Sequence, residues 1–324
     1  MECLVTGAGG FVGRAVIEAL SEAGWSGLAT GRAAPAGLPP GWRGWQRDDL
    51  LARPDAARPR AIVHLESRSP ADDAPEGDGG MFDRVNVGGT REWLEWAAAA
   101  GTRRFVLVGS ILAVVPADGP RTEEAPLVAD DSYGGSKARA EAVLREWCAA
   151  DAGRRGVILR SAPVYGPDER SNLLPFVRRV IAGKPVVIGE GRAVRSIVSR
   201  RNLAAAVVFA LSRDVLPCEV FNVADAHPVA LAELAALVAS AAGVPVPRRV
   251  PAWAAALAAP VGDLATLLTG RPMPIGMSRL RASRVSIDFP CDRLVAAGFR
   301  HAESTRDGLA RLVTWCRSLP GSGH

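Results

Sequence analysis

Residues 2–13, ECLVTGAGGFVG, join a short apolar strand to three glycines that stand three residues apart, Gly7, Gly10 and Gly13. A helical run, Arg14–Ala23, follows at once. In this context the first glycine lets the strand turn sharply, the second lets the backbone approach a pyrophosphate, and the third lets the helix pack on the sheet. The helix N-terminus then faces the phosphates, so the stretch predicts a dinucleotide site after the first strand.

Strands and helices alternate beyond this stretch, which is typical of an α/β fold, and we expect a Rossmann-type doubly wound parallel sheet. Further strands are expected at Ser26–Thr30, near Trp45, and at Ala61–Leu65, Arg104–Val108 and Gly156–Arg160, with a long helix at Met81–Ala100. Past residue 160 the pattern predicts short strands at Val186–Ile188, Val194–Val198 and Glu219–Val223, and helices at Leu173–Ala182, Asn202–Leu211 and Leu231–Ala242. We therefore expect a dinucleotide-binding domain of residues 1–165 plus about 200–225. A smaller C-terminal α/β substrate lobe should comprise about 166–199 and 226–324.

Composition excludes several other classes of protein. Apolar residues make up 48% and charged residues 23%, as in globular domains, and the net charge of +5 comes without a run of like charge or a nucleic-acid motif. Five cysteines without C-x-x-C spacing and four scattered histidines indicate no disulfide framework and no metal site. No signal-peptide pattern precedes the first strand, and prolines interrupt the longest apolar stretch, Val250–Leu268. We expect a cytoplasmic protein with no transmembrane segment, in which this stretch covers a substrate site or makes a weak interfacial contact.

Tyr133 and Lys137 stand four residues apart at the start of a predicted helix, so their side chains share one face. An ammonium beside a phenol favours the phenolate and lowers the tyrosine pKa from about 10 toward the range of a general acid or base. The chain has two tyrosines and two lysines, and its other basic residues are all arginine. Although an amphipathic helix that begins with an aromatic residue is the alternative, this sparing use of lysine favours a catalytic pair.

The second strand ends at Gly31-Arg32, where an NAD-specific protein usually has an acidic residue. No Asp or Glu follows until Asp48. Because an arginine can pair with a 2′-phosphate, we expect NADP(H) to be preferred, with NAD(H) as the alternative. The other interpretation of Arg32 is a solvated loop residue.

With these features placed, the chain resembles the extended short-chain dehydrogenase/reductases, in particular the nucleotide-sugar epimerase/dehydratase/reductase group. The resemblance covers nearly the whole chain and departs from the family pattern at Glu66, where alanine is usual, and at Ala113-Val114-Val115, where V-Y-G is usual. The matching segments are Thr6–Gly13, Val63–Leu65, Asn86–Thr90, Phe105–Ile111, Tyr133–Lys137, Arg160–Pro167, Asn172–Pro175, Arg195–Val198 with Asn202-Leu203, Phe221–Val223 and Gly298-Phe299.

The resemblance implies a role for individual residues. Ser110, Tyr133 and Lys137 would be catalytic, although a serine at a strand end is often only a local hydrogen-bonding residue. The implied substrate-binding residues are Ser110, Tyr133, Asn172, Leu173 and Arg195, the last holding a diphosphate. The implied cofactor-binding residues, with Arg32 from the reasoning above, are Gly7, Gly10, Phe11, Val12, Gly13, Arg32, Asp49, Leu50, Leu65, Asn86, Tyr133, Lys137, Pro163 and Val164.

The same resemblance implies hydride transfer between a nicotinamide and the carbon of a nucleotide-diphosphate sugar. Because NADPH is favoured, we expect an NDP-4-keto-sugar reductase, with a UDP-hexose 4-epimerase as the alternative. A dehydratase is disfavoured, because Ile111-Leu112 stands where that branch has an Asp-Glu pair. A reductase of a non-sugar ketone and a non-catalytic family member remain as further alternatives.

A homodimer is also expected. The helices Glu92–Ala100 and Ala138–Ala150 would pair with their copies in a four-helix interface, as the family resemblance suggests. These helices carry more apolar residues than are needed to cover one face of the sheet, including Trp93, Trp96, Val143, Leu144 and Trp147.

Overall fold

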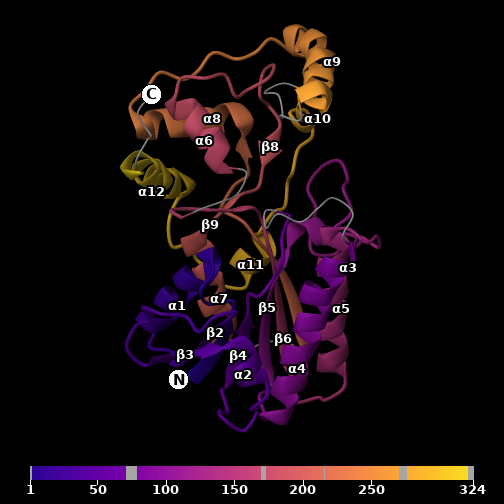
Figure 1. The fold of residues 1–324 in the computed structure, drawn as a ribbon, viewed down its shortest axis with the longest axis vertical. Coiled ribbons are helices and arrows are strands. Elements are labelled where there is room, and N and C mark those ends of the chain that lie inside the picture. The colour runs from indigo at the N-terminus through magenta and orange to yellow at the C-terminus, as the bar shows by residue number, and fades with distance from the viewer. Residues whose placement is uncertain (1, 71–78, 169–172, 215, 270–275, 320–324) are drawn as a thin grey trace.

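The computed structural model describes residues 2–70, 79–168, 173–214, 216–269 and 276–319. Its central sheet has seven parallel strands in the order β10-β6-β5-β4-β1-β2-β3 (Figure 1). The strands are β1 (Glu2–Thr6), β2 (Ser26–Gly31), β3 (Trp42–Gln46), β4 (Ala61–His64), β5 (Arg104–Ser110), β6 (Arg155–Ser161) and β10 (Cys218–Val223). The predicted doubly wound α/β fold is confirmed.

The strand order reverses on either side of β1. Thr6 at its end pairs with Thr30 of β2 on one side and with His64 of β4 on the other. In a doubly wound sheet, chains leave such a point toward opposite faces and open a crevice beyond the carboxyl ends of the strands. The glycines that follow Thr6 therefore lie where a ligand is expected.

Helices cover both faces of the sheet (Figure 1). On one face α1 (Phe11–Glu22) and α7 (Arg200–Ser212) share an apolar core with the sheet, and on the other α4 (Gly89–Ala99) and α5 (Tyr133–Ala149) do so. The prediction of surplus apolar positions on α4 and α5 is wrong, because all five are buried within a single chain. Their exposed fractions are at most 8% at Trp93, Trp96, Val143, Leu144 and Trp147.

The predicted helix at Met81–Ala100 is three segments. A short α3 (Gly79–Phe82) leads into a π-helix, Asp83–Gly88, and then into α4. The π-helix contains Asn86, so this departure from the prediction falls at a predicted site residue.

The C-terminal lobe is built on a core between α6 (Leu173–Ile181), α8 (Leu231–Ala242) and α12 (Thr305–Ser318). The strand predicted at 186–188 is only an isolated bridge from Ile188 to Val250, and the one at 194–198 is divided into two-residue strands. The other elements are the 3-10 turn η2 (Ile111–Ala113), α2 (Arg47–Leu51), β7 (Val164–Tyr165), β8 (Val194–Arg195), β9 (Val198–Ser199), β11 (Val229–Ala230), α9 (Ala252–Thr269), α10 (Met277–Ala282) and α11 (Asp292–Ala296).

One buried carboxylate, Asp225, connects segments that are far apart in the chain. It accepts hydrogen bonds from Tyr165 Oη at 2.7 Å, Asn202 Nδ2 at 2.7 Å, Thr305 Oγ1 at 3.0 Å and the Ser199 backbone at 3.0 Å. Residues near α11 also return to the sheet, where Phe289, Leu294 and Phe299 join its core. The predicted division into 1–165 with 200–225 and the remaining lobe stays a prediction.

Candidate functional site

The glycine loop is shaped by two close approaches of backbone. Gly7 has φ +66°, a conformation that side chains disfavour. A Cβ added at Gly13 would lie 2.3 Å from the carbonyl oxygen of Gly7, so glycine is needed where α1 begins this near the turn. At Gly10 a Cβ would meet only that same oxygen, at 3.2 Å, which leaves its outer side open to a ligand.

The first turn of α1 suits a phosphate group. Its N-cap is Gly10, no described side chain accepts a hydrogen bond from the helix start, and the first turn has no acidic residue. The first backbone N–H groups of the helix, beginning with those of Phe11 and Val12, can therefore donate hydrogen bonds to an anion. The positive end of the helix dipole also favours an anion there. These observations fit the pyrophosphate of a nicotinamide dinucleotide, as predicted.

The other predicted cofactor residues differ in accessibility. Arg32 is exposed and makes no hydrogen bond or ion pair with the described residues, so its guanidinium is free to meet a 2′-phosphate. Asp49 is also exposed, whereas the Leu50 side chain is fully buried in the core behind the sheet, so only its backbone could face a cofactor. Leu65 and Val164 are half-buried, and Pro163 is exposed.

Glu66, the departure from the family pattern, lies beside the glycine loop. A Cβ at Gly7 would lie 2.9 Å from its backbone nitrogen. Its carboxylate accepts hydrogen bonds from Arg47 Nε at 2.7 Å and from Trp93 Nε1 at 3.0 Å. Arg47 balances the negative charge that Glu66 brings next to the proposed pyrophosphate site. Sequence reasoning noted Glu66 but missed Arg47, which is 19 residues away.

Tyr133 and Lys137 lie at the start of α5, where the N-cap Ser132 accepts a hydrogen bond from the Gly135 backbone at 3.2 Å. The Lys137 ammonium is 5.9 Å from the Tyr133 ring centre and donates to the Val108 carbonyl at 3.4 Å. The Phe82 ring meets the Tyr133 ring edge-on, with centres 5.7 Å apart. The predicted shared face of the pair is thus present in the fold.

Ser110 ends β5 and is brought near this helix by close packing. The helix start presses on the turn that follows Ser110, because a Cβ at Gly134 would lie 2.2 Å from the carbonyl oxygen of Leu112. Ser110 Oγ accepts a hydrogen bond from the Leu112 backbone at 3.2 Å, which fixes the side chain and leaves its hydroxyl proton to donate. Ser110, Tyr133 and Lys137 therefore belong to one neighbourhood of β5 and α5.

Lys137 is a buried base. Burial lowers its pKa to about 8, and the Glu141 carboxylate, one helical turn on, partly opposes this by favouring the charged form. Glu141 is itself fully buried and forms a bidentate pair with Arg160, whose Nε and Nη2 each lie 2.9 Å from a carboxylate oxygen. The three residues Tyr133, Lys137 and Glu141 thus recur every four positions on one face of α5.

Asn86 uses its side-chain amide within the protein. Its Oδ1 accepts from the Arg68 backbone at 2.8 Å and Ser67 Oγ at 3.1 Å. Its Nδ2 donates to Ser136 Oγ at 2.9 Å and to the Arg68 carbonyl at 3.1 Å. Since these four bonds meet its full capacity, Asn86 connects the chain after β4 to α5 next to Lys137. Its predicted contact with a cofactor stays a prediction.

The structure describes only some of the predicted substrate residues. Asn172 lies outside the described residues, and Leu173 is half-buried at the first position of α6. Arg195 donates to the carbonyl oxygens of Val194 at 2.8 Å, Val285 at 2.6 Å and Ala282 at 2.5 Å. Among the described residues, two of its five N–H donors remain for a ligand.

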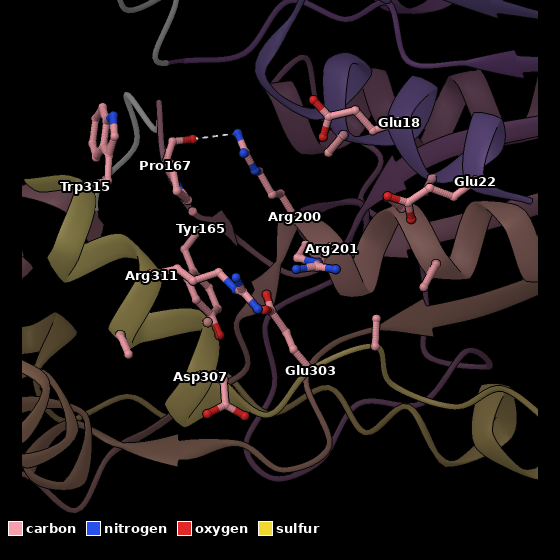
Figure 2. Close-up of a pocket in the computed structure, with 18 of the residues that line it drawn as sticks. Glu18, Glu22, Tyr165, Pro167, Arg200, Arg201, Glu303, Asp307, Arg311 and Trp315 are labelled. Atoms are coloured by element: carbon pink, nitrogen blue, oxygen red, sulfur yellow. Dashed lines mark hydrogen bonds and ion pairs between the residues drawn. The ribbon is translucent and has the colours of Figure 1, made fainter. Parts of the chain in front are cut away.

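A groove of about 1110 Å³ lies elsewhere, between α1, α7 and α12 (Figure 2). Glu18, Arg200 and Arg311 project from its walls, and Arg311 pairs with Glu303 at 2.8 Å. None of the three predicted catalytic residues lines it, so it is separate from the candidate active site. Among the described residues no group of three metal-binding side chains occurs, and no helix has the length and hydropathy to cross a membrane.

Comparison with known proteins identifies a family. The model of the NAD dependent epimerase/dehydratase family matches residues 3–224. The chain is 31% identical over 266 residues to a 3-diazoavenalumate denitrifying reductase of Streptomyces sp., covering 78% of this chain and 85% of that one. It is 32% identical over 180 residues to a UDP-glucose 4-epimerase of Vibrio cholerae, covering 53% and 54%. The solved structure of MoeE5 in complex with UDP-glucose and NAD matches with a TM-score of 0.73 and 23% identity, covering 98% of this chain and 99% of that one.

Proposed function

Because the chain belongs to the NAD dependent epimerase/dehydratase family, we propose that it is an NAD(P)-dependent oxidoreductase that reduces an NDP-4-keto sugar. The observation that carries this proposal is the pairing of Tyr133 with the buried ammonium of Lys137 on α5, next to the end of β5 with Ser110. The Vibrio cholerae relative, whose name gives UDP-glucose as its substrate, supports the substrate class.

In the reductive direction a bound dinucleotide would supply the hydride. The chain would supply the proton and the charged and hydrogen-bonding groups that favour its transfer. Tyr133 Oη donates a proton to the sugar keto oxygen while Ser110 Oγ donates a hydrogen bond to the same oxygen. The positive charge of Lys137 favours the phenolate that Tyr133 becomes. Because Lys137 is buried, little water screens this charge.

A UDP-hexose 4-epimerase is the alternative for the same residues. Such an enzyme would remove a hydride from C4 of the sugar and a proton from the hydroxyl on that carbon. It would then return the hydride to the other face of C4 and the proton to the oxygen, so it would keep its oxidised cofactor bound between turnovers. The cofactor found in the purified protein distinguishes the two. Copurifying NAD⁺ favours the epimerase, whereas a protein that arrives without cofactor and takes up NADPH favours the reductase.

A second candidate, a reductase of a non-sugar ketone, is favoured by Arg195. This predicted diphosphate ligand already donates three hydrogen bonds to backbone carbonyls, one from the preceding residue Val194 and two from Ala282 and Val285 at and after the end of α10. These hydrogen bonds give Arg195 a structural role, so its presence does not by itself require a diphosphate ligand. The Streptomyces relative, a reductase whose name mentions no sugar, supports the same alternative.

Calorimetry with UDP on the cofactor-loaded protein tests the substrate class. We expect measurable binding that weakens about tenfold or more in Arg195→Ala, since one charge-assisted hydrogen bond contributes roughly 1.5–3 kcal/mol. Arg192→Ala is the matched control, because Arg192 is close in the chain but 86% exposed and, among the described residues, paired only with Glu190. If wild type binds no UDP or other nucleoside diphosphate at millimolar concentration, the non-sugar reductase replaces our first proposal, and the roles of Tyr133 and Lys137 stand.

A further inference from the structure

Helix α9 presents a row of large apolar side chains to solvent. Trp253, Leu257 and Val261 recur every four residues and are 70%, 71% and 67% exposed. Ala255 and Ala259 are fully buried, and they pack with Leu280 of α10. A shift of two residues turns a helix by about 200°, so the exposed row lies opposite the face that holds α9 to the lobe. We call these three residues the α9 stripe.

The α9 stripe carries no charge. The single acidic residue of the helix is Asp263, whose carboxylate accepts a hydrogen bond from the Met277 backbone of α10 at 3.1 Å and so faces that neighbour. The helix is not long and apolar enough to span a bilayer. An uncharged stripe on a helix of this kind is suited to lie along an interface between water and an apolar phase.

Positive charge is concentrated in the segment of the chain that carries the α9 stripe. Residues 244–287 contain six arginines and one acidic residue, a surplus of five that equals the net charge of the whole chain, +5. The rest of the sequence is therefore balanced. Four of these arginines are described and exposed, two directly before α9 and two at or after α10: Arg248, Arg249, Arg281 and Arg284.

We propose that the α9 stripe and these four arginines form a surface that binds the anionic face of a lipid bilayer. The stripe would enter the boundary between headgroups and acyl chains, and the arginines would attract the headgroups. A second copy of this chain is the poorer occupant, because it would bring the same positive surplus against itself. Figure 1 shows α9 at the end of the molecule away from the central sheet, where a planar surface can reach it.

Vesicle flotation of the full chain tests the proposal. We expect binding to vesicles of phosphatidylcholine mixed with phosphatidylglycerol, little binding to phosphatidylcholine alone, and weaker binding as salt is raised. Leu257→Ser combined with Val261→Ser should lower the binding constant tenfold or more. Arg281→Gln should lower it roughly fivefold, the effect of about 1 kcal/mol per basic residue near the surface.

Matched substitutions outside α9 serve as controls. Leu216→Ser replaces another leucine, 64% exposed, and Arg91→Gln removes an exposed arginine on α4. Both should bind vesicles as wild type does. The proposal is overturned if wild type does not bind the anionic vesicles, or if the α9 variant binds them equally well. It is also overturned if wild type does not bind vesicles but forms an oligomer, or a complex with an acidic protein, that the α9 substitutions disrupt. The stripe would then contact protein.

Discussion

The ring of Tyr133 meets the edge of the Phe82 ring and lies near the ammonium of Lys137, and neither of these contacts uses the hydroxyl. Tyr133→Phe should therefore keep the fold and the cofactor affinity while it removes the proton donor. We expect turnover to fall by about 10²–10⁴, the usual contribution of a general acid. Steady-state kinetics with the preferred substrate measures this loss, and calorimetry with cofactor is the control. Turnover close to wild type would remove Tyr133 from the mechanism.

Arg32 decides the cofactor in our proposal. Because it is exposed and unpaired among the described residues, it breaks no interaction with them when it binds a 2′-phosphate. NADP(H) should bind more tightly than NAD(H), and Arg32→Ala should remove most of the difference by weakening NADP(H) alone. Arg43→Ala, which removes an exposed arginine on β3, is the control. Equal affinities of wild type for the two cofactors would show that Arg32 is only a solvated loop residue.

At the scale of the element, α5 carries the proposed catalytic pair and its support on one face. Lys137 lies between Tyr133 and Glu141, and Glu141 is neutralised by Arg160 from β6. The helix therefore positions the ammonium with a buried ion pair one turn behind it.

Glu141→Gln should have two separable effects. It leaves Arg160 buried without its partner, which should lower the free energy of unfolding by about 3–5 kcal/mol in urea denaturation. It also removes the carboxylate that raises the pKa of Lys137, so this pKa should fall below about 8. Lys137 then loses its proton at lower pH, and the alkaline limb of the kcat/KM profile should move in that direction.

Glu141→Leu with Arg160→Met removes both charges and is the control for stability. It should recover part of the lost free energy, while the shift of the pH profile persists because the carboxylate is still absent. A pH profile unchanged in both variants would mean that Glu141 supports the fold alone and does not act on Lys137.

The elements that the sequence predicted well are those with local signals. The glycine loop and the Tyr133–Lys137 pair each lie within a few residues of chain, where spacing reports geometry directly. Arg47 beside Glu66 and the carbonyls around Arg195 come from distant segments, so no spacing could indicate them. The π-helix at Asp83–Gly88 was missed because hydrophobic periodicity does not distinguish it from an α-helix of similar length.

At the scale of the whole molecule, Asp225 connects the end of the central sheet with β7, α7 and α12. It follows β10 of the sheet and binds Tyr165, Asn202 and Thr305, the last of which begins α12. Burial raises the pKa of Tyr165, and the neighbouring Asp225 carboxylate adds to this, so the phenol stays protonated and serves as a donor to Asp225. The second tyrosine of the chain is thus structural, in contrast to the role proposed for the first.

The homodimer remains a prediction of the family resemblance. The fold changes which side chains we expect to form its interface. The outward faces of α4 and α5 carry alanines among charged side chains, because their large apolar residues are used inside one chain. Small exposed residues such as Ala98 and Ala142 let two helices approach closely, so a four-helix interface of this kind would depend on close contact. We expect sedimentation equilibrium to show a dimer at micromolar concentration that Ala142→Glu converts to monomer, because a carboxylate cannot fit a closely packed contact without being buried. Ala258→Glu, on α9, is the control and should leave the dimer intact. A wild-type chain that sediments only as a monomer would remove α4 and α5 from any self-association.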